Sequence, residues 1–298
     1  MSSLPIVFIH KGNSWYLPYT LYQAHVTNPD SDIFLIGDCQ TLHFPSWVKH
    51  IDYSDYNDSL SELLKVYQHH SSLGKDFELV CIERWFVLYA FMVDKKIDKC
   101  VYLDSDVLVY SDLSAVHQLM PAHSMTWLGF SAHTNFINDI NSLKLYCDNV
   151  IDSYCDNLPE NIKNKTFFFE RINNNNNMNI SDMTFWADYN LRYPGQLLDI
   201  SKACEYGAFD ISTEHSFEYD SLDNDFKKIY FKGMVPYCKT KSGQEYIPFL
   251  TLHFAAKTKF LLKQYFQYST IEFKVFRFVN NIRLLIISIL RKLKLFHL

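Results

Sequence analysis

The chain has 298 residues, of which 48% are hydrophobic and 20% are charged. This composition excludes a disordered chain, and the length is sufficient for one sizeable α/β core. With 8 glycines and 9 prolines, collagen-like and glycine-rich architectures are excluded, and a net charge of −5 argues against a nucleic-acid-binding protein.

The first half of the chain alternates short apolar runs with helix-like segments. Strands are expected at residues 5–10, 32–37 and 99–110, and helices at 15–25, 59–69 and 78–93. Strands that alternate with helices predict βαβ units. We therefore expect an α/β fold whose mainly parallel sheet is flanked by helices.

The second half is less regular. We expect a strand at 127–132, helices at 138–157 and 181–191, a hairpin over 227–238 and a buried strand at 247–254. The asparagine run at 173–177 is expected to be a surface loop. No linker precedes about residue 262, so we expect one domain over 1–262 and a helical tail over 263–298.

Cysteine usage and the termini indicate a location. Seven cysteines, an odd number without a CxxC pair, favour a reducing compartment. The first residues lack the features of a signal peptide, and the apolar run at 284–290 is far shorter than the roughly 20 residues of a membrane span. We expect a cytoplasmic protein.

Two acidic residues interrupt the most strand-like segment of the chain. Asp104 and Asp106 lie in VYLDSDVLVY, and side chains two apart on a strand point to the same side. Two carboxylates among apolar residues repel each other and lose hydration, which a divalent cation such as Mn²⁺ or Mg²⁺ would relieve. The alternative is a strand end with two solvated aspartates.

The segment CVYLDSDVLVYSDL resembles the DxD segment of GT-A nucleotide-sugar glycosyltransferases, and is most similar to the glycogenin-like and lipopolysaccharide glucosyl- and galactosyl-transferase family. That family also carries a late HFxGxxK motif, which HFAAKTK (residues 253–259) resembles with Ala256 in place of glycine. The resemblance implies that Asp104, Asp106 and His253 hold the metal. It also implies that Asp104 contacts the ribose or sugar, and that Lys259, or Lys257, contacts the donor phosphates. The alternative for His253 is a half-buried strand histidine bonded to backbone.

Arg84 lies in an apolar helical segment, where a cation needs an anionic partner. The resemblance implies that Arg84 contacts the donor sugar or an aspartate of the DxD segment. An exposed arginine paired with a surface acid is the alternative. The neighbouring Glu83 is expected to face solvent.

Ligands of doubly wound sheets bind at the carboxyl ends of strands. His10, Gly12 and Asn13 follow the first strand, and Asp38 follows the second. They are candidates for holding the nucleoside of the donor, with ordinary turn residues as the alternative.

Asp182 opens the helix at 181–191, where the resembling family has an Asp-Gln pair that faces the sugar; here Met183 replaces the glutamine. Asp182 is therefore a candidate catalytic residue that orients sugar hydroxyls or acts as a base. The alternative is a plain N-cap. Asp210, Glu214 and Glu218 are further candidate bases.

The tail from residue 263 combines a broad apolar stripe with basic residues. It carries seven basic residues and one acid, a charge of +6, so the rest of the chain carries −11. This is the pattern of a helix that lies on an anionic membrane surface. The alternative is a C-terminal helix that packs on the protein's own core.

Together these features predict a metal-dependent glycosyltransferase that uses a nucleotide-diphosphate sugar, with a UDP-sugar as the expected donor. Its acceptor would be a glycan or lipid-linked glycan of bacterial surface polysaccharide synthesis, at the inner face of the cell membrane. Two rivals are a sugar nucleotidyltransferase and a catalytically inactive module that binds nucleotide or glycan at the membrane.

Overall fold

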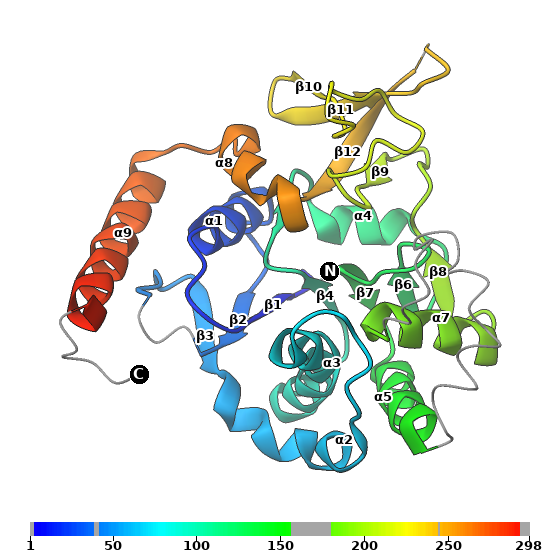
Figure 1. Cartoon of the computed structure of the whole chain (residues 1–298). Coiled ribbons are helices and arrows are strands. Elements are labelled where there is room, and N and C mark those ends of the chain that lie inside the picture. Colours follow the sequence, from blue (N-terminus) through cyan, green and yellow to red (C-terminus); the bar gives the residue numbers. More distant parts are fainter. Residues whose placement is uncertain (1–2, 39–41, 156–179, 244, 293–298) are drawn as a thin grey trace. The chain divides into compact units, whose positions relative to one another are not determined.

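A computed structural model describes residues 3–38, 42–155, 180–243 and 245–292 (Figure 1). The chain forms two compact units. Unit 1 comprises Met1–Asp52, Val101–Met120 and Ser201–Leu298, and unit 2 comprises Tyr53–Cys100 and Pro121–Ile200. The expected division into a domain over 1–262 and a tail over 263–298 stays a prediction.

Unit 1 contains a parallel sheet with the strand order β3-β2-β1-β4. Its strands are β1 (Ile6–His10), β2 (Ile33–Gly37), β3 (Val48–Asp52) and β4 (Cys100–Leu103). β1, β2 and β4 are continuous apolar runs with mostly buried side chains, as expected of strands covered on both faces. Helix α1 (Leu17–Thr27) connects β1 to β2, with Pro18 in the first turn, where no backbone N–H is needed.

A second sheet of unit 1 is mainly antiparallel, with the order β10-β11-β12-β5 and the short β9 beside β12. These strands are β5 (Val107–Val109), β9 (Ala208–Phe209), β10 (Ile229–Lys232), β11 (Val235–Lys239) and β12 (Tyr246–His253). Helix α4 (Leu113–Leu119) follows β5, and Asp112 caps it by accepting from the N–H groups of Ser114 and Ala115. The segments η3 (Ala256–Leu261) and α8 (Leu262–Tyr265) follow β12.

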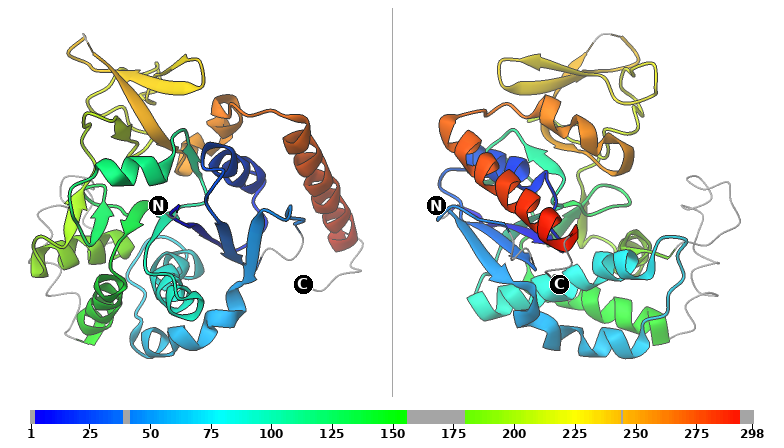
Figure 2. Two further views of the ribbon diagram at one scale, coloured as in Figure 1. Left: turned by 180° about the vertical axis from the view of Figure 1, so that it is seen from behind. Right: turned by 60° about the vertical axis from the view of Figure 1, so that its left-hand side comes forward.

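The C-terminal helix α9 (Ile271–Lys292) packs beside α1 (Figures 1 and 2). Phe273 and Phe276 are buried in the same apolar cluster as Tyr19 and Tyr22. Asn280 exchanges two hydrogen bonds with the backbone of His43, which fix the helix to the loop before β3. Among the described residues, no helix is both long and apolar enough to cross a bilayer.

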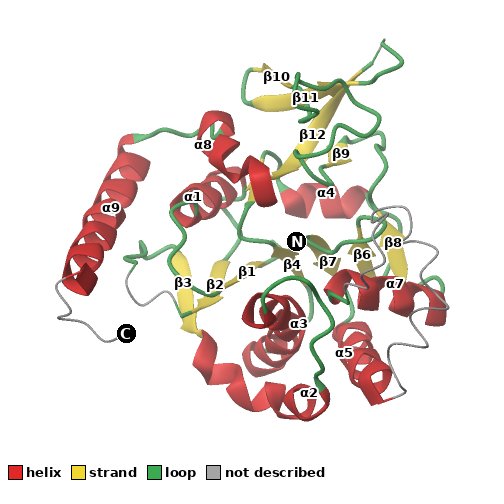
Figure 3. Cartoon of the chain, viewed as in Figure 1, coloured by secondary structure: helices red, strands yellow, loops and turns green. Residues whose placement is uncertain are grey.

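The described part of unit 2 is built mainly of helices, coloured red in Figure 3, beside three short strands. They are η1 (Tyr53–Leu60), α2 (Ser61–Val66), α3 (Lys75–Lys95), α5 (Ile140–Cys155) and α7 (Asp182–Arg192), with β6 (Met125–Trp127), β7 (Thr134–Ile137) and β8 (Leu197–Asp199). Trp85, Tyr146 and Trp186 form its aromatic core, with the rings of Tyr146 and Trp186 stacked at 3.9 Å.

The predicted α/β class, with a mainly parallel sheet flanked by helices and a C-terminal helix, is confirmed. The continuous strand expected over 99–110 is wrong, because β4 and β5 belong to different sheets. The strand expected at 127–132 is also wrong; the strands lie at Met125–Trp127 and Thr134–Ile137. Helix α2 is shorter than expected because a 3₁₀ segment precedes it. The asparagine run at 173–177 lies outside the described residues.

Candidate metal and donor site

The acidic pair lies in a turn that joins the two sheets of unit 1. The N–H of Val107 donates to the carbonyl of Asp104 at 3.1 Å, which closes a turn over Asp104, Ser105 and Asp106. The sequence suggested that strand alternation brings the two side chains together. This expectation is wrong, because both residues lie in a turn and not in a strand. They share one site because the chain reverses at the carboxyl end of β4, the edge where ligands of such sheets bind.

His253 reaches this turn through the pairing of β12 with β5. His253 lies opposite Val107 in the antiparallel register. The next residue, Phe254, donates its N–H to the carbonyl of Asp106 at 3.0 Å. A residue some 150 positions away in sequence is thus held next to the acidic turn by backbone hydrogen bonds.

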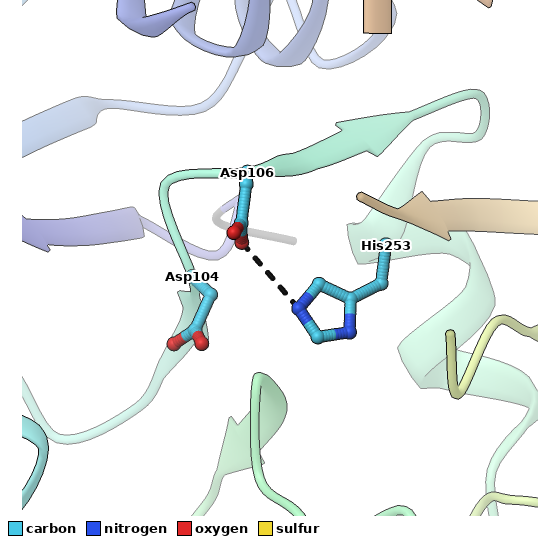
Figure 4. Close-up of side chains that lie close together, drawn as sticks. All are labelled: Asp104, Asp106 and His253. Carbon is cyan, nitrogen blue, oxygen red and sulfur yellow. Dashed lines mark ion pairs between the residues drawn. The ribbon is translucent and has the colours of Figure 1, made fainter. Parts of the chain in front are cut away.

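Asp104, Asp106 and His253 form a cluster whose potential ligand atoms all lie within 4.8 Å of one another (Figure 4). His253 Nε2 is 3.4 Å from Asp106 Oδ1, and Lys259 Nζ is 3.1 Å from Asp106 Oδ2. The hydroxyl of Tyr102 donates to Asp104 Oδ1 at 2.6 Å. Two carboxylates and two cationic side chains therefore converge at one point of unit 1.

The charges of the cluster stabilise one another. Burial alone would raise the pKa of Asp106, but His253 and Lys259 outweigh it, and the pKa falls below its usual range. Burial would lower the pKa of His253, whereas Asp106 raises it to about 9. The pKa of Lys259 is likewise raised, because Asp106 outweighs desolvation. Asp106 is therefore ionised at neutral pH and available as a ligand.

The residues fit a divalent cation. Asp106 Oδ1 is buried and accepts no hydrogen bond from the described residues. His253 Nδ1 is 3.0 Å from the carbonyl of Ile211, to which it donates, so Nε2 faces Asp106 and is the nitrogen that becomes a ligand when a cation displaces its proton. Because the ligand atoms lie within 4.8 Å of one another, each would have to move by less than about 1 Å to bind an ion at their centre with bonds of about 2.1 Å.

A buried ion pair contacts the backbone of His253. Asp210 and Lys227 form a salt bridge in which both side chains are almost fully buried. The other oxygen of Asp210 accepts the N–H of His253 at 3.0 Å. The suggestion that Asp210 acts as a base is therefore wrong, since one of its oxygens is paired with Lys227 and the other accepts from the backbone of β12. Seventeen residues separate Asp210 from Lys227, and no motif in the sequence indicates the pair.

The two lysines after His253 differ. Lys259 Nζ contacts Asp106 and lies 5.2 Å from the centre of the Tyr16 ring. Lys257 is 80% exposed and lies 3.6 Å from Glu214. Of the two candidates, the structure brings Lys259 to the acidic turn. Glu214 has a lysine partner, and Glu218 is exposed.

The residues after β1 and β2 lie together in unit 1. His10 Nδ1 is 2.8 Å from the hydroxyl of Ser105, between the two aspartates. Burial lowers the pKa of His10 to about 4, so its ring is neutral. The N–H of Gly12 donates to Asp38 at 2.5 Å, and Gly12 has a φ of 92°, which favours glycine. Asn13 Oδ1 is buried without a hydrogen-bond partner among the described residues.

Arg84 and Asp182 form an ion pair inside unit 2. Arg84 Nη2 is 2.5 Å from Asp182 Oδ2, and Trp85 Nε1 donates to the same oxygen at 3.3 Å. Ser181, not Asp182, is the N-cap of α7, and its N–H donates to the Thr184 hydroxyl. Arg84 is therefore not an exposed arginine with a surface partner. The expectation for Glu83 is wrong, because Glu83 is buried and accepts from the Tyr53 hydroxyl.

No protein-family model matches the chain, and no curated protein is detectably similar to it in sequence. Solved structures are similar. A galactosyltransferase, LgtC, in complex with donor and acceptor sugar analogues shares 14% identity over 92% of this chain and 100% of its own, with a TM-score of 0.48. Mouse xyloside xylosyltransferase 1 shares 11% over 66% and 84%, with a TM-score of 0.46. The glycosyltransferase GlyE in Streptococcus pneumoniae shares 13% over 93% and 62%, with a TM-score of 0.44.

These proteins are glycosyltransferases, the class that the segment around Asp104 and Asp106 resembles.

Proposed function

We propose that the chain is a metal-dependent glycosyltransferase that moves a sugar from a nucleotide-diphosphate donor, a UDP-sugar, to a glycan or lipid-linked acceptor. One observation carries the proposal: a buried, ionised Asp106 whose Oδ1 accepts no hydrogen bond from the described residues lies beside Asp104, His253 and Lys259. A carboxylate left in this state is suited to a cation that arrives with a ligand.

The proposed roles follow from the charge that develops as the bond between sugar and diphosphate breaks. Mn²⁺ or Mg²⁺ held by Asp104, Asp106 and His253 would supply a Lewis acid for the diphosphate. Lys259 adds a positive charge at the same place. An imidazole nitrogen next to two carboxylates favours Mn²⁺ over Mg²⁺, which prefers oxygen ligands.

The remaining candidates hold the donor in this proposal. His10 is the last residue of β1, Gly12 and Asn13 follow β1, and Asp38 follows β2. All four are assigned to the nucleoside. Arg84 and Asp182 are assigned to the sugar and the reacting carbon. The acceptor is assigned to bacterial surface polysaccharide synthesis at the inner face of the cell membrane. The basic, apolar helix α9 supports that location.

The test is hydrolysis and transfer across a panel of sugar nucleotides, with Mn²⁺ added or removed by chelation. Wild-type protein is compared with Asp104→Asn and with Asp223→Asn, an exposed acid of the same unit that serves as a control. We expect Mn²⁺-dependent turnover of a UDP-sugar by wild type and the control, and a large loss in Asp104→Asn.

Two outcomes would contradict the proposal. Donor that binds with Mn²⁺ but is never turned over would identify an inactive binding module. Release of pyrophosphate from a nucleoside triphosphate and a sugar 1-phosphate would identify a nucleotidyltransferase.

A further inference from the structure

Helix α9 has two apolar faces, and the described residues of the chain cover only one of them. Phe273, Phe276 and Asn280 lie on the covered face, where the Phe273 ring is 5.0 Å from Tyr19 and the Phe276 ring is 5.8 Å from Trp47. The sequence left two alternatives open, a helix on a membrane or a helix on the protein's own core. The structure shows the core contact, and it accounts for one side of the helix.

The opposite face is a continuous apolar stripe. Six of its members recur at alternating spacings of four and three residues, which places them on one side of a helix, and Ile286 lies next to Leu285 at the edge of that side. Each is at least 41% exposed, and Phe278 and Leu285 exceed 60%. The stripe consists of Ile271, Val275, Phe278, Ile282, Leu285, Ile286 and Ile289. Single exposed apolar side chains are ordinary, but seven on one face mark a surface that another apolar phase covers.

The charges beside the stripe select the kind of partner. Lys274 and Arg283 lie on α9 outside the stripe and are exposed, and the sequence continues with Arg291, Lys292 and Lys294. Glu272 is the one acid in the sequence of the helix, and it accepts hydrogen bonds from the Tyr22 hydroxyl and from Trp47 Nε1. A second copy of this helix would bring like charges together. An anionic surface with an apolar interior satisfies both the stripe and its basic flanks.

We infer that the outer face of α9 docks unit 1 on an anionic lipid surface, with the stripe in the acyl boundary and Lys274 and Arg283 at the headgroups. The inference rests on the proposed function only for the location of the acceptor. Since the inner face of the same helix is packed into unit 1, the unit that carries Asp104, Asp106 and His253 is held at the membrane by a packed helix and not by a loose tether.

Deleting the helix would not test this, because the deletion would also remove Phe273 and Phe276 from the core. Point substitutions on the outer face avoid that problem. The test is flotation of the full chain with vesicles of phosphatidylcholine alone or mixed with phosphatidylglycerol, for wild type and Phe278→Gln/Leu285→Gln. The matched control, Leu64→Gln/Leu119→Gln, removes two exposed leucines elsewhere.

We expect wild type and the control to float with anionic vesicles only, and binding to weaken as salt rises. The stripe variant should lose roughly tenfold or more of this binding, while donor hydrolysis in solution stays at the wild-type rate. Equal vesicle binding by wild type and the stripe variant would overturn the inference. A wild-type dimer that the stripe variant converts to a monomer, without vesicle binding, would overturn it in favour of self-association. Donor hydrolysis is measured separately, so failure of the proposed activity remains distinguishable.

Discussion

Unit 1 contains two buried aspartates with cationic partners, and they differ in how completely they are satisfied. Both oxygens of Asp210 have a donor, Lys227 Nζ on one side and the N–H of His253 on the other. Asp106 has Lys259 on Oδ2, whereas the contact of its Oδ1 within the described part of the chain is an ion-pair contact of 3.4 Å with His253. His253 touches both aspartates, through its backbone and through its ring.

The difference indicates a structural role for Asp210 and a ligand-binding role for Asp106. A buried ion pair with every lone pair engaged has no capacity for a ligand, and its loss is felt as instability. A buried carboxylate with an unfilled oxygen can accept a cation without first breaking a hydrogen bond. The same residue type therefore has opposite expected consequences at two positions joined by one histidine, and four experiments follow from this contrast.

The largest effect is expected for Lys227→Met. It leaves the Asp210 carboxylate buried without its cation, which typically costs about 3–5 kcal/mol in the free energy of unfolding. Urea denaturation measures this, and the double variant Asp210→Asn/Lys227→Met should recover much of the loss because no charge stays buried. A single variant as stable as wild type would mean that the pair does not support β12.

Asp106→Ala should show the reverse pattern. Removing a ligand and a focus of negative charge should reduce turnover of the donor by about 10²–10³. The melting temperature should stay close to the wild-type value, since Lys259 is partly exposed and His253 can lose its proton. Turnover and thermal unfolding are measured on the same preparation. If Asp106→Ala melts far below wild type, Asp106 is a structural residue like Asp210.

His253→Ala sharpens the contrast at the residue that both aspartates share. The backbone N–H that Asp210 accepts is kept, while the ring that faces Asp106 is lost. We expect the Mn²⁺ concentration for half-maximal activity to rise roughly 10–100-fold, with a small change in stability. A variant that is destabilised but has an unchanged Mn²⁺ requirement would show that His253 has a structural role, like Asp210 and Lys227.

Glu78 extends the series to a buried carboxylate that lies in unit 2 and forms no salt bridge with the residues that the structure describes. Its Oε2 accepts from the Ser71 hydroxyl at 3.2 Å, and Oε1 is buried without a hydrogen bond from the described residues. Burial, followed by the nearby charge of Asp182, raises the pKa of Glu78 from 4.5 to about 7. An acid with a raised folded pKa contributes stability at low pH, and this contribution is lost as the pH rises from about 4.5 through about 7.

Glu78→Gln should therefore match wild type near pH 5 and be more stable than wild type by roughly 1–2 kcal/mol at pH 8. Urea denaturation at the two pH values measures the difference. A Glu78→Gln curve parallel to that of wild type across this range would show that the Glu78 carboxylate is ionised at both ends.

Elements with strong periodicity could be predicted from the sequence. The apolar runs of β1 and β2 and the long helix α3 lie close to the expected residues. β3 has two exposed and two half-buried residues and no apolar run, so local pattern could not reveal it. The residues of the acidic turn could be singled out, but the turn itself could not, because a change of sheet depends on which strands pair later in the chain.

The partners of the site residues show the same division. His253 was found through its spacing to Lys259 in a motif. Asp210 and Lys227 were not found as a pair, because their contact arises from the packing of β9 and β12 with the loop before β10. Burial of Glu83 depends on a hydroxyl from Tyr53, thirty residues earlier, and no local pattern encodes such a contact.

The pairing of β12 with β5 also limits where this chain can change in length. His253 faces Asp106 only while Thr251, Leu252 and His253 stay opposite Val109, Leu108 and Val107. Inserting or deleting one residue between Phe249 and His253 would shift the pairing by one step and turn the imidazole to the other side of the sheet. The turn between β10 and β11 carries no such constraint, since its register ends at Lys232 and Val235. Natural or engineered insertions and deletions should therefore be tolerated at the tip of that hairpin. They should be absent from the segment of β12 that pairs with β5 up to His253.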